Sequence, residues 1–172
     1  VIYQSVDGGV SWSYAESSRL NDTGSQKGWR ALAFAPSNTQ QAYAGSSAYI
    51  SAGSFDDDLD SSGIYRTDDG GNSWYSSNDV YSSTANVAAI DIDPSNADRV
   101  FVASTNKGIM NSINGGINWQ MLSEGLPSEV GALSVAINPN DLQNVFAGFI
   151  RGGLYQSTDG GTNWAKIFSG LL

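Results

Sequence analysis

A twelve-residue pattern recurs four times along the chain and constrains the fold more than any other feature. The copies occupy 1–12, 63–74, 108–119 and 153–164, and each joins a short apolar run to a Gly-Gly pair and then to a Trp. The tryptophans are 62, 45 and 45 residues apart. A period of this length is typical of arrays in which each repeat is one supersecondary unit that stacks on its neighbours.

A second motif alternates with the first. It occupies 32–38, 90–96 and 135–141, where a mainly apolar run is followed by Pro and two polar residues. Each copy precedes an alternating apolar run at 41–45, 99–103 or 144–148. One period therefore predicts four short strands, which we letter A to D in chain order. Pro falls in the A–B turn, where it costs no ladder hydrogen bond, and Gly-Gly falls in the C–D turn, where positive φ is tolerated. The sequence predicts an all-β fold made of four-stranded antiparallel blades, a β-propeller.

The strand count predicts about three and a half blades. Residues 1–15 hold strands C and D of a half blade, and complete blades follow at 29–79, 85–124 and 130–169, so that 1–172 form one partial β-propeller. Closed propellers use about four to eight blades. Three explanations fit: a piece of a longer polypeptide, a ring completed by another chain, or an open stack. We favour the first, and expect the partner to be the remaining blades, from the same polypeptide or another chain.

Composition removes several classes of function. Among 172 residues there is neither Cys nor His, which excludes disulfides, Cys nucleophiles, Ser-His-Asp triads and His-based zinc sites. A net charge of −9 argues against a nucleic-acid partner. No apolar stretch is long enough to predict a membrane span. Low charge and abundant Ser, Asn, Gly and Thr favour a secreted or cell-surface protein.

The spacing Ser/Thr-x-Asp-x-Gly-x-x-Trp resembles the Asp-box, or BNR repeat, of sialidases, xyloglucan-degrading propeller hydrolases and sortilin-type receptors. The resemblance implies a propeller, but unrelated activities share the motif, so it does not imply one function. The motif positions are Ser5, Asp7, Gly9, Trp12, Thr67, Asp69, Gly71, Trp74, Ser112, Asn114, Gly116, Trp119, Ser157, Asp159, Gly161 and Trp164.

These motif residues are interpreted as structural. The Asp side chains are expected to accept backbone N–H groups across the C–D turn, and each Trp to be buried against the neighbouring sheet. Asn114 replaces Asp in the third copy yet keeps an acceptor. Because backbone donors lower the pKa of a carboxyl, these Asp residues would be poor general acids.

The functional face is predicted on the other rim. Strands alternate in direction, so the A–B and C–D turns share one rim, and the D–A and B–C connections share the opposite one, where the resembling families bind ligands. The first full period has 17 more residues than the later ones, and all of them fall in D–A and B–C connections. Candidate ligand-face residues are the aromatics Trp29, Tyr49, Phe55 and Tyr81, for stacking on sugars, and the cations Lys107 and Arg151, for an anionic group.

The inserted B–C connection is acidic. Asp56, Asp58, Asp60 and Ser62 have the alternating oxygen spacing of a calcium loop. The match is incomplete, because Ser61 stands where a sharp-turn Gly is expected and Thr67 where a Glu would close the site. A solvated acidic loop is the alternative. Calcium is the one cofactor that the sequence suggests.

Catalysis would have to use carboxylates. Glycoside hydrolysis needs two of them across a sugar, and the candidates are Glu16, Glu124 and Glu129, in or near D–A connections. A sialidase is disfavoured because its Arg cluster is missing. We expect a non-catalytic extracellular propeller segment that acts as a scaffold or as a recognition module for glycan or protein. The alternative is part of a xyloglucanase-like glycoside hydrolase whose site is completed by residues outside this chain.

Overall fold

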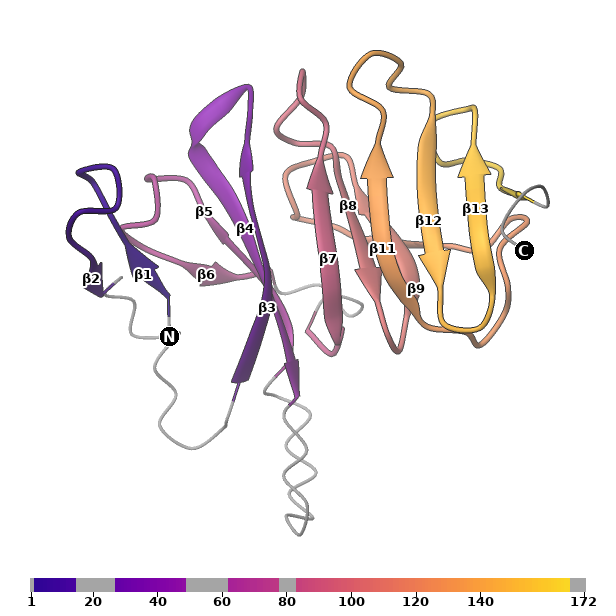
Figure 1. Cartoon of the computed structure of the whole chain (residues 1–172), viewed down its shortest axis with the longest axis horizontal. Coiled ribbons are helices and arrows are strands. Elements are labelled where there is room, and N and C mark those ends of the chain that lie inside the picture. The colour runs from indigo at the N-terminus through magenta and orange to yellow at the C-terminus, as the bar shows by residue number, and fades with distance from the viewer. Residues whose placement is uncertain (1, 15–26, 49–61, 78–82, 168–172) are drawn as a thin grey trace, which may run out of the picture.

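The computed structural model describes residues 2–14, 27–48, 62–77 and 83–167, and these residues form strands and turns without a helix (Figure 1). A two-stranded sheet comes first, followed by three four-stranded sheets. The strands are β1 (Tyr3–Gln4), β2 (Ser13–Tyr14), β3 (Lys27–Ala35), β4 (Asn38–Ala48), β5 (Gly63–Thr67), β6 (Tyr75–Ser76), β7 (Val87–Ile92), β8 (Val100–Ser104), β9 (Gly108–Ser112), β10 (Gln120–Leu122), β11 (Ala132–Ile137), β12 (Val145–Phe149), β13 (Gly153–Ser157) and β14 (Ala165–Lys166).

Each four-stranded sheet is an antiparallel meander in chain order, and the first sheet contains the equivalents of strands C and D alone. We call the sheets blade 1 (β1–β2), blade 2 (β3–β6), blade 3 (β7–β10) and blade 4 (β11–β14). They follow one another along the long axis of the molecule in Figure 1. The predicted all-β partial propeller is confirmed.

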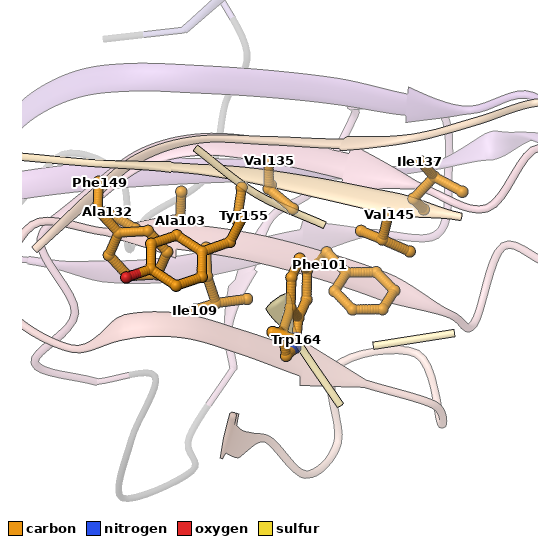
Figure 2. Packing of buried hydrophobic residues seen from close by; sticks show 11 residues of the cluster. Phe101, Ala103, Ile109, Ala132, Val135, Ile137, Val145, Phe149, Tyr155 and Trp164 are labelled. Atoms are coloured by element: carbon orange, nitrogen blue, oxygen red, sulfur yellow. The ribbon is translucent and has the colours of Figure 1, made fainter. Parts of the chain in front are cut away.

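The core lies between the blades. One cluster joins blades 3 and 4, and Figure 2 shows the ring of Trp164 facing Phe101 within it. A second cluster joins blades 2 and 3 around Tyr43, Ile64 and Trp119. A smaller one joins blades 1 and 2, where Ile2 packs beside Trp74. Burial between neighbouring sheets, rather than within one sheet, therefore holds the stack together.

Backbone hydrogen bonds assign the turns to two rims. The first Gly of each C–D turn donates its N–H to a residue after the A–B turn of the same blade. These bonds are Gly70 to Gln40 at 2.8 Å, Gly115 to Asp98 at 2.9 Å and Gly160 to Gln143 at 2.8 Å. On the opposite rim, Thr105 donates to Asn86 at 2.9 Å and Ile150 to Gly131 at 2.8 Å, so B–C turns meet D–A connections there.

We call the segments 5–12, 67–74, 112–119 and 157–164 the corners. In the second corner, Asp69 accepts the N–H of Ser73 at 2.8 Å through Oδ1 and its hydroxyl at 2.6 Å through Oδ2. The Thr67 hydroxyl oxygen accepts the N–H of Gly71 at 2.9 Å. The Trp74 indole N–H donates to the Gly71 carbonyl at 3.1 Å. The corner is thus closed by its own side chains.

The corner carboxyls are strongly acidic. Hydrogen bonds lower the pKa of Asp7, Asp69 and Asp159 from 3.8 to about 2. The main donor is a hydroxyl four residues later at Asp7 and Asp69, and the backbone N–H of Asn163 at Asp159. These groups are ionised at neutral pH and hold a turn, which suits a structural role.

Burial of the corner tryptophans is unequal. Trp74, Trp119 and Trp164 are 4–5% exposed, whereas Trp12, which the sequence also predicts to be buried, is 63% exposed. Each buried ring packs against the blade that precedes its own, as Trp164 does against Phe101 of blade 3. Trp12 belongs to blade 1, and among the described residues no sheet packs on the side of blade 1 that faces away from blade 2.

Side chains also connect consecutive blades at the corner rim. In blades 1, 2 and 3, a side-chain N–H group donates a hydrogen bond to the backbone carbonyl of the first corner Gly in the following blade. Gln4 donates to Gly70 at 2.9 Å, Arg66 donates to Gly115, and Arg99 donates to Gly160 at 3.0 Å. Arg99 is also paired with Asp93 at 2.8 Å. The side chains of Arg66 and Arg99 on this rim therefore serve to connect neighbouring blades.

Candidate functional site

A cavity of about 550 Å³ opens on the rim opposite the corners. It lies between the β8–β9 turn, the connection from β10 to β11, and the end of β12. These are B–C and D–A segments, the class of connection in which the sequence predicts a ligand face. The cavity is the candidate site of the described part of the chain.

The β8–β9 turn is fixed by Asn106. Its Oδ1 accepts the N–H of Asn86 at 2.8 Å and the hydroxyl of Ser104 at 2.7 Å, and its Nδ2 donates to the carbonyl of Thr84 at 2.9 Å. Asn is suited to this place because its amide supplies both a donor and an acceptor. The wall of the cavity is thus preorganised by blade 3 itself.

Close backbone approach sets the opposite wall. A Cβ at Gly131 would lie 2.2 Å from the carbonyl oxygen of Thr105, so only Gly lets the strand entering blade 4 pass this turn. A Cβ at Gly125 would lie 1.9 Å from the carbonyl oxygen of Trp164. The D–A connection is therefore pinned at both ends, and residues 126–130 between the glycines line the cavity.

The cavity brings together two of the predicted residues, Lys107 and Glu129. Glu129 is exposed and has a φ of 58°, in the left-handed region that non-Gly residues seldom adopt. Arg151, in the β12–β13 turn, has a φ of 56°. It lies on the same rim but is outside the cavity wall. Backbone strain of this kind concentrates at functional sites.

Glu124 lies on the same connection as Glu129 but in another place. It is exposed, its backbone carbonyl accepts the N–H of Trp164 at 3.1 Å, and its side chain is not part of the cavity wall. Among the described residues, Glu129 is therefore the only carboxylate that lines the cavity. A second carboxylate for hydrolysis does not come from this wall.

Apolar residues form most of the remaining lining, and the sequence interpretation missed them. They include Met121, Leu122, Leu126, Pro127, Val130 and Phe149. The ring of Phe149 is in edge-to-face contact with Tyr155, with centroids 5.3 Å apart. The sequence could have indicated Phe149 as a lining residue, because it lies at the end of a strand B, just before a B–C turn on the ligand-face rim. An aromatic and aliphatic wall with few polar groups is typical of a small-molecule site.

The remaining predicted residues lie elsewhere. Trp29 is half-buried on β3 and contacts Tyr65 edge to face at 5.1 Å, between blades 1 and 2 and away from the cavity. Ser62 is buried. Glu16, Tyr49, Phe55, Asp56, Asp58, Asp60 and Tyr81 are outside the described residues, so the calcium loop stays a prediction. The described ranges contain no cluster of acidic side chains able to hold a metal, and no helix that could span a membrane.

Comparisons with known proteins support the fold. No family model and no curated protein matches the chain. Among solved structures, an ancestral GH74 enzyme superposes with a TM-score of 0.72 and 23% identity over 97% of this chain and 21% of its own. The GH74 enzyme of Niastella koreensis gives 0.60 and 26%, over 82% of this chain and 22% of its own. YCF48 bound to a D1 peptide gives 0.60 and 12%, over 83% and 41%.

The chain thus spans about a fifth of the length of the GH74 enzymes that it matches. Together with the three complete four-stranded blades, these superpositions show that the chain has the fold of a partial β-propeller.

Proposed function

We propose that this chain is a segment of a secreted or cell-surface glycoside hydrolase propeller of the GH74 kind, and that it supplies a glycan-binding stretch of that protein's ligand face. The observation that carries the proposal is the cavity beside Glu129, on the rim that the corners leave free. The superposition on an ancestral GH74 enzyme over 97% of the chain supports it. Remaining blades would complete the propeller and its active site.

The lining favours binding over chemistry within this segment. Sugar hydroxyls need hydrogen-bond acceptors and donors, which Glu129 and Lys107 supply, and the apolar faces of sugar rings pack on aliphatic and aromatic walls. Hydrolysis needs two carboxyl groups across the scissile bond. Since the described wall supplies one, the 172-residue chain is expected to bind glycan without cleaving it.

The test is a titration of the full chain with xyloglucan oligosaccharides, followed by NMR and calorimetry. We expect saturable binding with shifts at Gly108 and Glu129, and weakening of about tenfold in Glu129→Gln, because a hydrogen bond to a charged group contributes about 1.5–3 kcal/mol. Glu124→Gln is the matched control, since its carboxylate lies on the same connection outside the cavity.

Loss of affinity in both variants, or in neither, contradicts this placement of the site. Release of new reducing ends by the 172-residue chain would contradict the assignment of a binding role without catalysis.

A non-catalytic module that recognises protein is the second candidate. Its support is the fold likeness to YCF48, solved with a D1 peptide bound, and the single carboxylate in the described wall. Under this proposal the same cavity takes an extended peptide. Binding of unrelated peptides at Glu129, with no response to oligosaccharides, would favour it over the glycan proposal.

A further inference from the structure

The third corner differs from the second and the fourth at its exposed tip. Its second and sixth positions are Ile113 and Ile117, which are 74% and 67% exposed. With Asn114 in place of Asp, this corner also carries no charge. Blade 3 has a packed blade on either side, so these side chains are exposed by the turn itself. Polar residues occupy the same positions in the second and fourth corners, namely Asp68, Asn72, Thr158 and Thr162.

A groove of about 260 Å³ lies beside this tip, between the third corner and blade 2. Ile117 lines it from the corner, and Arg66, Tyr75 and Ser77 line it from blade 2. The ring of Tyr75 is 39% exposed, and the guanidinium carbon of Arg66 lies 5.6 Å from the centroid of this ring. The groove therefore joins an exposed aliphatic side chain to an exposed aromatic one.

The polar groups of the groove are already bonded to the protein itself. The Ser77 hydroxyl donates to the carbonyl of Gly116 and accepts the indole N–H of Trp119 at 2.7 Å. Arg66 donates to both carboxylate oxygens of Asp68, at 2.8 and 2.7 Å. What the groove offers to a partner is therefore mainly its aliphatic and aromatic carbon atoms, which favours an apolar side chain as the occupant.

The rim around this groove is acidic. All eight aspartates of the described residues lie in or next to A–B and C–D turns, which share this rim. The cations Arg66 and Arg99 also lie there, and each is paired with an aspartate, at 2.7 and 2.8 Å. Hydrogen bonds lower the pKa of Asp69 to about 2, so its charge is present at neutral pH. Such a surface repels nucleic acids and anionic membranes and attracts a cationic protein segment.

We propose that the exposed tip of the third corner and the groove beside it form a docking site for a segment of a partner protein in which a large apolar side chain is flanked by Lys or Arg. The apolar side chain packs against Ile117 and Tyr75. The flanking cations face Asp68 and Asp98, which are exposed beside the groove; Asp98 Oδ1 lies 2.7 Å from where a Cβ of Gly115 would be. This site is on the opposite rim from the candidate glycan site, so the two can be occupied together.

A differential selection tests the proposal. A library of short random peptides is panned in parallel on the immobilised 172-residue chain and on its double variant Ile113→Thr, Ile117→Thr. The fourth corner carries Thr at both positions and is closed by the same hydrogen bonds, so the variant corner is expected to fold. We expect peptides with Phe, Leu or Trp next to Lys or Arg to be enriched on the unsubstituted chain and not on the variant.

An enriched peptide is then synthesised and titrated into the chain by NMR. We expect amide shifts over 115–117 and an affinity at least about tenfold lower in the double variant, because a few buried apolar anchors dominate the affinity of such interfaces. Asp98→Asn should weaken binding by about two- to fivefold, the contribution of one exposed ion pair, and this difference should shrink at high salt.

The matched control is Val6→Thr with Val10→Thr, which changes the same two positions of the first corner, 87% and 86% exposed, and should leave the affinity unchanged. Saturating xyloglucan oligosaccharide should not displace the peptide, because it is aimed at the other rim. A selection that yields no peptide able to distinguish the chain from the third-corner variant, or only acidic peptides, would overturn the proposal. So would an equal loss of affinity in the first-corner variant, or peptide-induced shifts at Gly108 and Glu129 instead of 115–117.

Discussion

The first corner has the same hydrogen-bond pattern as the second and fourth corners but very different surroundings. Ser11 donates its N–H to Asp7 at 2.9 Å, as Asn163 does to Asp159 at 2.8 Å, and the Trp12 indole still donates to Gly9 at 3.2 Å. Yet Trp12 is 63% exposed and Trp164 is 5% exposed. The turn is therefore determined by its own eight residues, whereas burial of the ring is provided by the preceding blade.

The largest expected effect separates these two contributions. Trp119→Ala removes a ring that is 4% exposed and should lower the free energy of unfolding by about 3–5 kcal/mol. Trp12→Ala should cost less than about 1 kcal/mol, because most of that ring is already in water. Urea unfolding followed by circular dichroism measures both. Equal losses would mean that Trp12 is buried in solution, against the structure.

The second corner Gly gives a smaller contrast of the same kind. Gly161→Ala places a methyl group 2.7 Å from Phe101 Cε1 at a φ of 97°, so strain and overpacking add to about 2–4 kcal/mol. Gly9→Ala meets nothing closer than Trp12 Cζ2 at 3.9 Å, at a φ of 92°. It should cost the strain alone, about 1–2 kcal/mol. Thermal unfolding of the two variants compares them, and a larger loss at Gly9 would contradict the packing argument.

How much of this follows from the sequence differs between the two rims. The spacing of the corner motif predicts the strands, the turns and the rim that the turns share. It does so because the requirements of a tight turn, such as positive φ at Gly-Gly, depend only on residues close in sequence. The exposure of Trp12 does not follow from its motif, since burial depends on which blade precedes it. On the opposite rim, Glu124 and Glu129 are indistinguishable in sequence. In the structure Glu129 lines the cavity and Glu124 does not. The close approach of Gly125 to the backbone of Trp164, beside Glu124, is a tertiary contact that the sequence does not reveal.

The bonds between blades allow a finer comparison. Gln4 joins blade 1 to blade 2 by one half-buried hydrogen bond of 2.9 Å to Gly70. Gln4→Ala should lower stability by about 1 kcal/mol, since a single neutral hydrogen bond contributes about that much. Gln120→Ala, at an exposed position of β10, is the matched control and should change stability by less than about 0.5 kcal/mol. No difference between the two in urea unfolding would mean that this bond does not hold blade 1.

The smallest expected effect concerns the third corner, where Asn114 accepts the N–H of Asn118 at 3.0 Å without a charge. The carboxyl introduced by Asn114→Asp meets the same donors as those of Asp69 and Asp159, so its pKa should fall well below the usual range. A carboxyl with a lowered pKa in the folded state adds stability above its unfolded pKa near 4, and this stability is lost as pH falls through the folded value. Asn114→Asp should therefore stabilise the chain at pH 7 and lose that gain between about pH 4 and pH 2.

NMR titration of the new carboxyl and unfolding measured across this pH range test the prediction, with Asp7→Asn as the reverse control. A stability difference from the unsubstituted chain that does not change with pH would show that the charge in the corner, unlike its hydrogen-bond geometry, contributes nothing.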